Sequence, residues 1–170
     1  MKVDTGEQMS KRFLANIALD HDLLFQFFLT FSRFEFALKS AGFALGNIHG
    51  SKPDWPRFGA SLDLDMARQD PNCAAAVDYL ALHPPWRQVV IAHGLAWDSS
   101  VSFTRLDRMD QVLELVRRIR NNLFHGSKFN DEVHSGLGRN ELLLRHSIAV
   151  LHRCLELSPS VAAPYDTATL

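Results

Sequence analysis

Phenylalanine is concentrated in one short stretch of this 170-residue chain, and this stretch constrains the fold more than any other feature. Eight of the twelve phenylalanines lie between residues 13 and 43. On a helical wheel, where successive residues are about 100° apart, one face of residues 20–41 is an apolar arc. Its members are Leu24, Phe27, Phe28, Phe31, Phe34 and Leu38, with Phe25, Leu29 and Phe36 widening it. A helix with so wide an apolar surface is expected at the centre of a helical bundle or in a dimer contact.

Capping residues and periodic apolar positions predict several further helices. Asp20 or Asp22 can begin the phenylalanine-rich helix, and Gly42 can end it. Asp54, and the pair Asp70 and Pro71, are typical helix starts. The expected helices span residues 7–18, 20–41, a short stretch opening at Asp54, residues 70–82, 105–124 and 140–157. The segment 89–92 is too short to assign as helix or strand and is expected to be buried.

These elements predict an all-α fold, a helical bundle of four or five main helices plus short helices. The length fits one domain, which we place at residues 1–157, followed by a flexible tail at residues 158–170. The most apolar run, residues 23–29, is far shorter than the roughly 20 residues needed to cross a bilayer. The first residues do not resemble an export signal. We therefore expect a cytoplasmic protein without a membrane partner.

Charge and cysteine content narrow the possible functions. The formal net charge of −1 and the pI near 6.7 argue against a DNA-coating protein but permit a local basic cluster. The two cysteines, Cys73 and Cys154, cannot form a multi-cysteine zinc site. The eight histidines lack the grouped spacing of a zinc helix motif. No metal and no cofactor is expected.

Two ionisable residues fall inside apolar arcs. Glu35 lies in the middle of the arc of helix 20–41. Arg120 lies near the centre of the arc of helix 105–124, which is formed by Met109, Val112, Leu113, Val116, Ile119 and Leu123. Because an unpaired buried charge costs several kcal/mol, each needs a partner or access to water. Two interpretations stay open: a structural ion pair between Glu35 and Arg120, or a polar site between helices or protomers.

A motif follows at the end of helix 105–124. Residues 116–126 read Val-Arg-Arg-Ile-Arg-Asn-Asn-Leu-Phe-His-Gly, so that a polar residue follows Arg120 directly and His125 lies five positions after it. Upstream, residues 31–39 read Phe-Ser-Arg-Phe-Glu-Phe-Ala-Leu-Lys and contain Arg33-x-Glu35. Over about residues 20–157 the chain resembles the HEPN superfamily, specifically its bacterial ribonuclease and toxin branch.

This resemblance implies a metal-independent endoribonuclease that works as a homodimer, with two motifs across a shared cleft. RNA would be cleaved by attack of the 2′-hydroxyl. His125 would be the general acid and base, because the ordinary pKa of histidine lies near neutrality. Arg120 would stabilise the transition state with its planar fork of donors, and Asn121 would orient His125 or hold the phosphate. Glu35 would support the site by holding an arginine.

Basic residues around the motif are candidates for RNA binding. Arg117, Arg118 and Lys128 could attract the RNA backbone, although Asp131 and Glu132 dilute the local charge. In a straight helix the five steps from Arg120 to His125 turn about 140° around the axis. The helix must therefore unwind near Gly126, or the catalytic groups must come from two chains.

The resemblance also covers relatives with other roles. The ribonuclease branch includes toxins and phage-defence effectors, so an antitoxin protein is a candidate partner. One subgroup has a tyrosine two residues after the motif histidine, where this chain has Ser127, so control by tyrosine modification is not expected. The alternative function is a non-catalytic HEPN-like module that binds nucleotides or proteins, for example as the silent partner in a toxin–antitoxin system.

Overall fold

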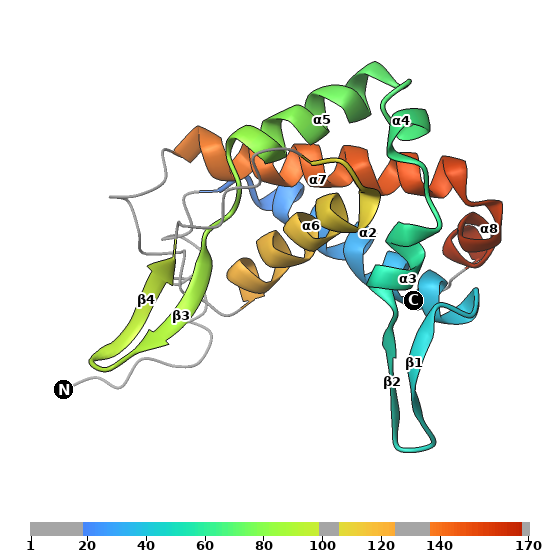
Figure 1. The fold of residues 1–170 in the computed structure, drawn as a ribbon, viewed down its shortest axis with the longest axis horizontal. Coiled ribbons are helices and arrows are strands. Elements are labelled where there is room, and N and C mark those ends of the chain that lie inside the picture. Colours follow the sequence, from blue (N-terminus) through green and yellow to red (C-terminus); the bar gives the residue numbers. More distant parts are fainter. Residues whose placement is uncertain (1–18, 99–105, 125–136, 168–170) are drawn as a thin grey trace.

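A computed structural model describes residues 19–98, 106–124 and 137–167 of the chain. Over these residues the protein has seven helices and two small antiparallel hairpins (Figure 1). The expected helical bundle is confirmed in outline, but the strands were not predicted. The expected helix over residues 7–18 lies outside the described residues, as do His125 and Lys128.

Helix α2 (His21–Ser40) is the phenylalanine-rich helix, and its ends match the prediction. The Asp20 carboxylate accepts hydrogen bonds from the backbone N–H groups of Asp22 and Leu23 at 2.9 and 3.1 Å, satisfying two of the free donors of the first turn. Gly42 follows the helix with a φ of +85°, a conformation that glycine adopts without steric cost. The buried side of the helix contains Leu23, Phe27, Thr30, Phe31, Phe34, Ala37 and Leu38.

Three shorter helices follow, each begun by an aspartate. They are α3 (Trp55–Ala60), α4 (Leu64–Ala67) and α5 (Pro71–Leu82). The carboxylates of Asp54, Asp63 and Asp70 accept backbone hydrogen bonds within the first turns. The helices at Asp54 and Asp70 were predicted, and α4 was not.

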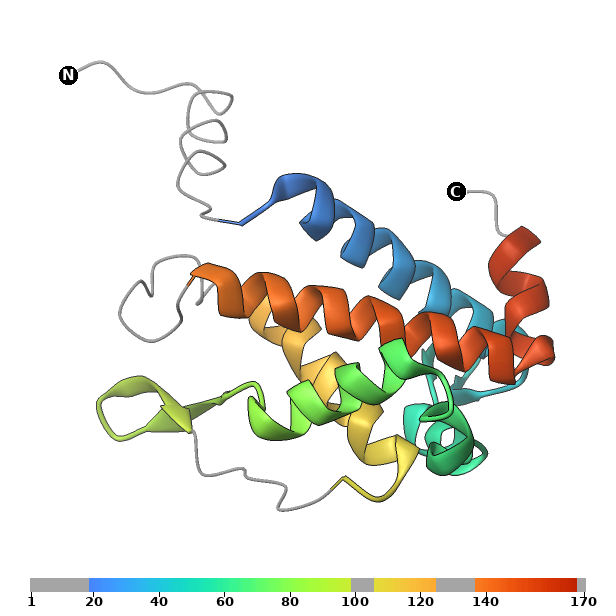
Figure 2. The ribbon, with the colours of Figure 1, turned by 90° about the horizontal axis from the view of Figure 1, so that it is seen from above.

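Two long helices complete the bundle. Helix α6 (Met109–Phe124) begins four residues later than expected, and α7 (Leu137–Leu157) begins three residues earlier. All six residues of the predicted α6 arc are buried. Figure 2 shows α7 running between α2 and α5 and contacting both, with α6 crossing the bundle beneath it. The apolar sides of these helices form one continuous core.

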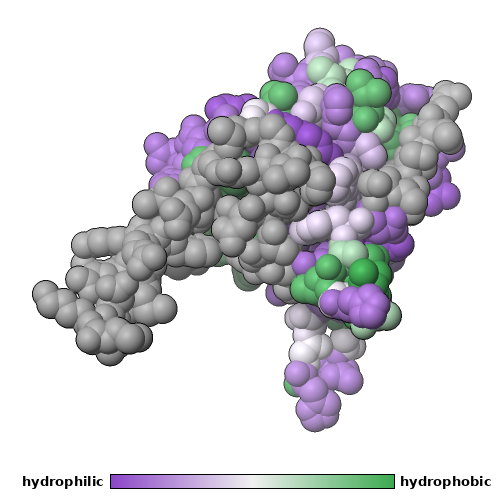
Figure 3. Space-filling model, turned by 90° about the vertical axis from the view of Figure 1, so that its left-hand side faces the viewer, coloured by the Kyte–Doolittle hydropathy of each residue, from purple (hydrophilic) through white to green (hydrophobic). Residues whose placement is uncertain are grey.

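Both hairpins project from the bundle (Figure 1). Strand β1 (Ala44–Asn47) pairs with β2 (Gly50–Pro53), and β3 (Arg87–Ile91) pairs with β4 (Gly94–Asp98). The expected burial of residues 89–92 was wrong, because the tip of the second hairpin extends beyond the core. Val90 is 83% exposed, and Leu95 opposite it is 68% exposed. On the molecular face that carries this hairpin, Figure 3 shows several hydrophobic areas, of which the most extensive lies below the centre among hydrophilic surroundings.

The segment after residue 157 is a helix where a flexible tail was expected. Helix α8 (Pro159–Thr167) packs against α2 and buries Val161. The guanidinium of Arg33 lies over the ring of Tyr165, 5.1 Å from its centroid, and donates hydrogen bonds to the carbonyl oxygens of Tyr165 and Asp166. A cation at these last carbonyls favours the helix end, and α8 is therefore ordered by tertiary contacts. None of the helices in the described ranges is long and apolar enough to cross a membrane.

Candidate functional site

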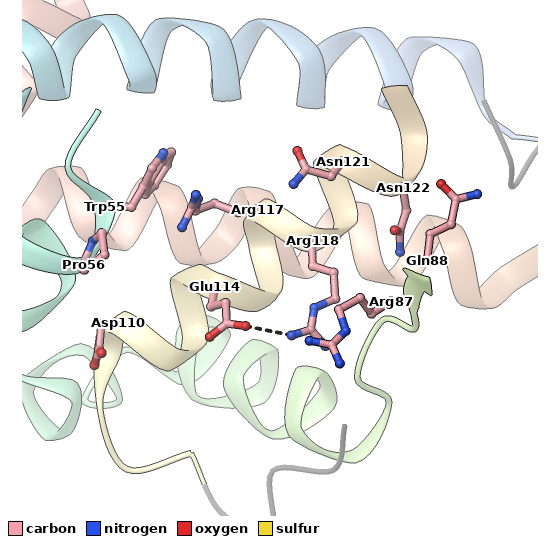
Figure 4. A pocket seen from close by; sticks show the side chains of 10 residues that line it. All are labelled: Trp55, Pro56, Arg87, Gln88, Asp110, Glu114, Arg117, Arg118, Asn121 and Asn122. Atoms are coloured by element: carbon pink, nitrogen blue, oxygen red, sulfur yellow. Dashed lines mark hydrogen bonds and ion pairs between the residues drawn. The ribbon is translucent and has the colours of Figure 1, made fainter. Parts of the chain in front are cut away.

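A polar cleft of about 510 Å³ lies between α3, α6 and the start of β3 (Figure 4). One face of α6 forms its floor, since positions three, four and seven residues apart share a side of a helix. The lining residues are Trp55, Pro56, Arg87, Gln88, Asp110, Glu114, Arg117, Arg118, Asn121 and Asn122. This set combines three guanidinium groups with three side-chain amides, which are donors suited to an anionic ligand.

Several charges around the cleft already have partners. Arg118 pairs with Glu114 at 2.7 Å, and Arg87 pairs with Asp98 at 3.1 Å. Arg108 pairs with Asp110 at 2.7 Å, and its hydrogen bond holds the pKa of the Asp110 carboxyl below its ordinary value. These pairs neutralise both acids of the cleft and two of its three arginines.

Two buried side chains of α6 fix the backbone that leads into β3. Arg118 is 9% exposed and donates from Nη1 to the carbonyl oxygen of Pro85 at 3.4 Å. Asn122 is 6% exposed and donates from Nδ2 to the carbonyl oxygen of Trp86 at 2.8 Å. Two consecutive carbonyls are thus held by residues one helical turn apart, which places the next residues, Arg87 and Gln88, at the edge of the cleft.

The first two residues of the motif contact each other. Nη1 of Arg120 donates to Oδ1 of Asn121 at 3.2 Å, and the Arg120 guanidinium lies 5.6 Å from the centroid of the Phe31 ring. A cation over an aromatic face is attracted to it, so Arg120 is anchored toward α2. The side-chain oxygen Oδ1 of Asn121 is engaged by Arg120. The Nδ2 group of the same amide makes no hydrogen bond to another described residue and can donate into the cleft.

Arg117 lies one turn before Asn121 on α6, and its guanidinium extends along the cleft toward Trp55 (Figure 4). No ion pair or hydrogen bond joins its guanidinium to another described residue. Arg117 and the amide of Asn121 therefore present two donors to one cleft, without a protein acceptor among the described residues.

Glu35 holds Trp55, one of the residues that line the cleft. Its carboxylate accepts a hydrogen bond from the indole Nε1 of Trp55 at 3.3 Å. The Trp55 ring stacks with the rings of both Phe31 and Phe34, whose centroids lie 5.3 and 5.4 Å from its own. Within the described part of the chain, Glu35 forms no ion pair with Arg120. The interpretation of these two residues as a structural ion pair is therefore wrong.

The structure brings together part of the predicted site. Arg117, Arg118 and Asn121 line one cleft. Arg120 contacts Asn121 but lies against Phe31 and is not among the residues that line the cleft. His125 and Lys128 lie outside the described residues. Sequence reasoning missed seven cleft residues: Trp55, Pro56, Arg87, Gln88, Asp110, Glu114 and Asn122. For Asn122 a signal was present, because it is the second asparagine of the motif. Asp110 and Glu114 lie on the same helix as the motif, whereas the others reach the cleft from distant segments.

A second hollow, of about 540 Å³, lies on another side of the bundle, between α2, α5 and α7. His146 lines it and stacks on Tyr79 with ring centroids 4.5 Å apart. Burial lowers the pKa of His146 below its ordinary value. Across residues 19–98, 106–124 and 137–167, no three histidine, cysteine or acidic side chains gather where they could hold a metal ion.

Comparison with known proteins gives no relative: the chain matches no family model, no curated protein and no solved structure.

Proposed function

We propose that the protein is a metal-independent endoribonuclease of the HEPN type. One observation carries the proposal: Arg120 and Asn121 contact each other in the last turns of α6, where Asn121 and Arg117 open on a polar cleft. Helix α6 extends to Phe124, directly before the motif histidine, His125. The resemblance of residues 116–126 to the HEPN signature supports the same assignment.

The proposed reaction is transesterification within the RNA backbone. The 2′-hydroxyl oxygen forms a bond to phosphorus and its proton passes to a histidine, while the bond from phosphorus to the 5′-oxygen breaks and that oxygen takes up a proton. The products are a 2′,3′-cyclic phosphate and a 5′-hydroxyl. His125 moves the protons, and Arg120 stabilises the charge on the phosphoryl oxygens. Asn121 supports the site by orienting His125 or holding the phosphate.

The test compares wild type with His125→Ala on end-labelled RNA in excess chelator, with the product ends mapped. General acid–base catalysis contributes about 100- to 10,000-fold, so the variant should lose at least about 100-fold in rate. His152→Ala is the matched control, because His152 is exposed on α7. It should cleave as the wild type does.

Three results would contradict the proposal. Cleavage retained in His125→Ala would mean that another group, or a contaminating nuclease, acts on the RNA. Products with 5′-phosphate ends would exclude 2′-hydroxyl attack. Circular dichroism of both variants excludes unfolding as the cause of a loss. RNA that is bound but never cleaved would favour the non-catalytic binding module.

We also propose that two copies pair to complete the site, because a straight helix turns about 140° between Arg120 and position 125. Light scattering should then give a mass near 38 kDa, twice that of the 19.2 kDa chain. A fully active monomer would contradict this.

The cellular role we propose is that of a cytoplasmic toxin or phage-defence effector that an antitoxin protein restrains. Expression of wild type, but not of His125→Ala, should then arrest growth. Equal growth of both strains would contradict the role.

A further inference from the structure

We infer that the cleft binds one nucleotide unit of unpaired RNA, with a phosphate on Arg117 and Asn121 and the base against Gln88. The inference rests on the proposed function in taking RNA as the ligand. It adds which groups bind which part of the substrate, and it identifies Gln88 as a specificity-determining residue.

The phosphate position follows from the charges in the cleft. Arg87 and Arg118 are neutralised by Asp98 and Glu114, whereas Arg117 has no acidic partner among the described residues. An anion at Arg117 therefore compensates a charge without breaking an existing ion pair. The Nδ2 group of Asn121, one turn away on the same helix face, supplies a second donor. A guanidinium beside an amide donor is a typical phosphate contact.

The base position follows from the amides at the β3 end. Gln88 is half-buried, lines the cleft, and makes no hydrogen bond from its side chain to another described residue. Asn122 lies close to it (Figure 4), with Nδ2 committed to Trp86 and Oδ1 remaining as an acceptor. An amide offers a donor and an acceptor side by side, which matches the edge of an unpaired base. The bonds to the carbonyls of Pro85 and Trp86 hold Gln88 in place before ligand binds.

The size of the cleft favours single-stranded RNA over duplex RNA. A volume of 510 Å³ equals that of a cube about 8 Å on each side, within the range typical of small-ligand pockets. Proteins that bind duplex RNA contact about 16 base pairs across two minor grooves, and the base edges there are already paired. A single strand can place one phosphate and one base inside the cleft.

Binding is measured in a His125→Ala background, so that cleavage does not interfere. The probes are fluorescently labelled octamers of A, C and U, and a duplex octamer, followed by anisotropy over a salt series. Arg117→Gln should weaken binding of the single strands about tenfold. It should also make the slope of log K against log salt shallower by about 0.7, the value for one phosphate contact on a single strand. Arg145→Gln is the matched control: this exposed arginine on α7 lies in the other hollow, and the change alters the net charge equally.

Gln88→Ala should leave the salt slope unchanged and reduce the differences in affinity among the three homopolymers to less than about twofold. The duplex should bind at least tenfold more weakly than the single strands. Equal losses in Arg117→Gln and Arg145→Gln would overturn the phosphate assignment. The base assignment would be overturned if the His125→Ala parent bound all three homopolymers equally, or if its preferences among them survived in Gln88→Ala. Equal binding of the duplex and the single strands would overturn the single-strand assignment.

These outcomes are separable from those of the cleavage assay. Failure of the wild type to cleave, with the expected binding pattern intact, would remove the proposed function alone. Cleavage that depends on His125, with binding insensitive to Arg117 and Gln88, would remove the present inference alone.

Discussion

Replacing Gly59 with alanine should push apart the two helices that form one end of the cleft. A Cβ atom built on Gly59 lies 2.5 Å from the Cα of Asp110 and 2.8 Å from its backbone nitrogen. Carbon atoms in van der Waals contact are about 3.5–4.0 Å apart. The clash is with backbone atoms of α6, which cannot rotate away, so α3 and α6 would have to separate by about 1 Å.

The expected magnitude combines two opposing effects. Overpacking of this kind costs about 1–3 kcal/mol. Alanine in place of glycine in a helix recovers about 0.5–1 kcal/mol. Because the obstacle is backbone, we expect a net loss of about 2 kcal/mol in the free energy of unfolding. At about 2–4 °C per kcal/mol for a domain of this size, the melting temperature should fall by about 4–8 °C.

Thermal and urea denaturation, followed by circular dichroism, measure this loss. Gly138→Ala is the matched control, because Gly138 is also helical and a Cβ atom there meets nothing within 4 Å. It should be as stable as the wild type or slightly more so. If Gly59→Ala proved as stable as Gly138→Ala, the close approach of α3 and α6 would not be the constraint that we infer.

Two further predictions concern Asn122 and His146. Asn122→Ala leaves the Trp86 carbonyl without its 2.8 Å donor and should lower the free energy of unfolding by about 1–3 kcal/mol, measured from urea midpoints; an unchanged midpoint would contradict a structural role. Because burial lowers the pKa of His146, the unfolded chain binds a proton more readily, so stability present above about pH 6.5 is lost as the pH falls toward the depressed folded pKa. His146→Phe should keep the stacking on Tyr79 and flatten this pH dependence; an identical pH profile in both proteins would assign the dependence to another group.

The helices could be predicted because their signals are local. Asp20, Asp54 and Asp70 each begin a helix with the side-chain contact that the sequence indicated. The hairpins lacked such a signal: strands β1 and β2 are almost entirely exposed, so they show no alternation between a buried and an exposed face. Helix α8 was missed because its order comes from Arg33, more than 120 positions earlier in the chain.

The candidate site was predictable only where it lies on one helix. The spacing of Arg117 and Asn121 places both on one side of α6, and the structure agrees. Sequence periodicity could not show that Trp55 would take the Glu35 carboxylate, since this contact depends on how α3 packs against α2. The same holds for Gln88, whose position depends on the bonds from Arg118 and Asn122 to the preceding backbone.

The hydrogen bonds from Arg118 and Asn122 tie the backbone before β3 to α6, so the second hairpin should move when α6 tilts. Strand β3 has five residues, which span about 16 Å at 3.3 Å per residue. If the hairpin moves as a rigid body, a tilt of the last turns of α6 by about 10° would therefore displace its tip by about 3 Å. Small movements of α6 at the cleft floor should therefore become larger displacements at Val90 and Leu95 near the hairpin tip. An environment-sensitive dye attached there would report these displacements from outside the cleft.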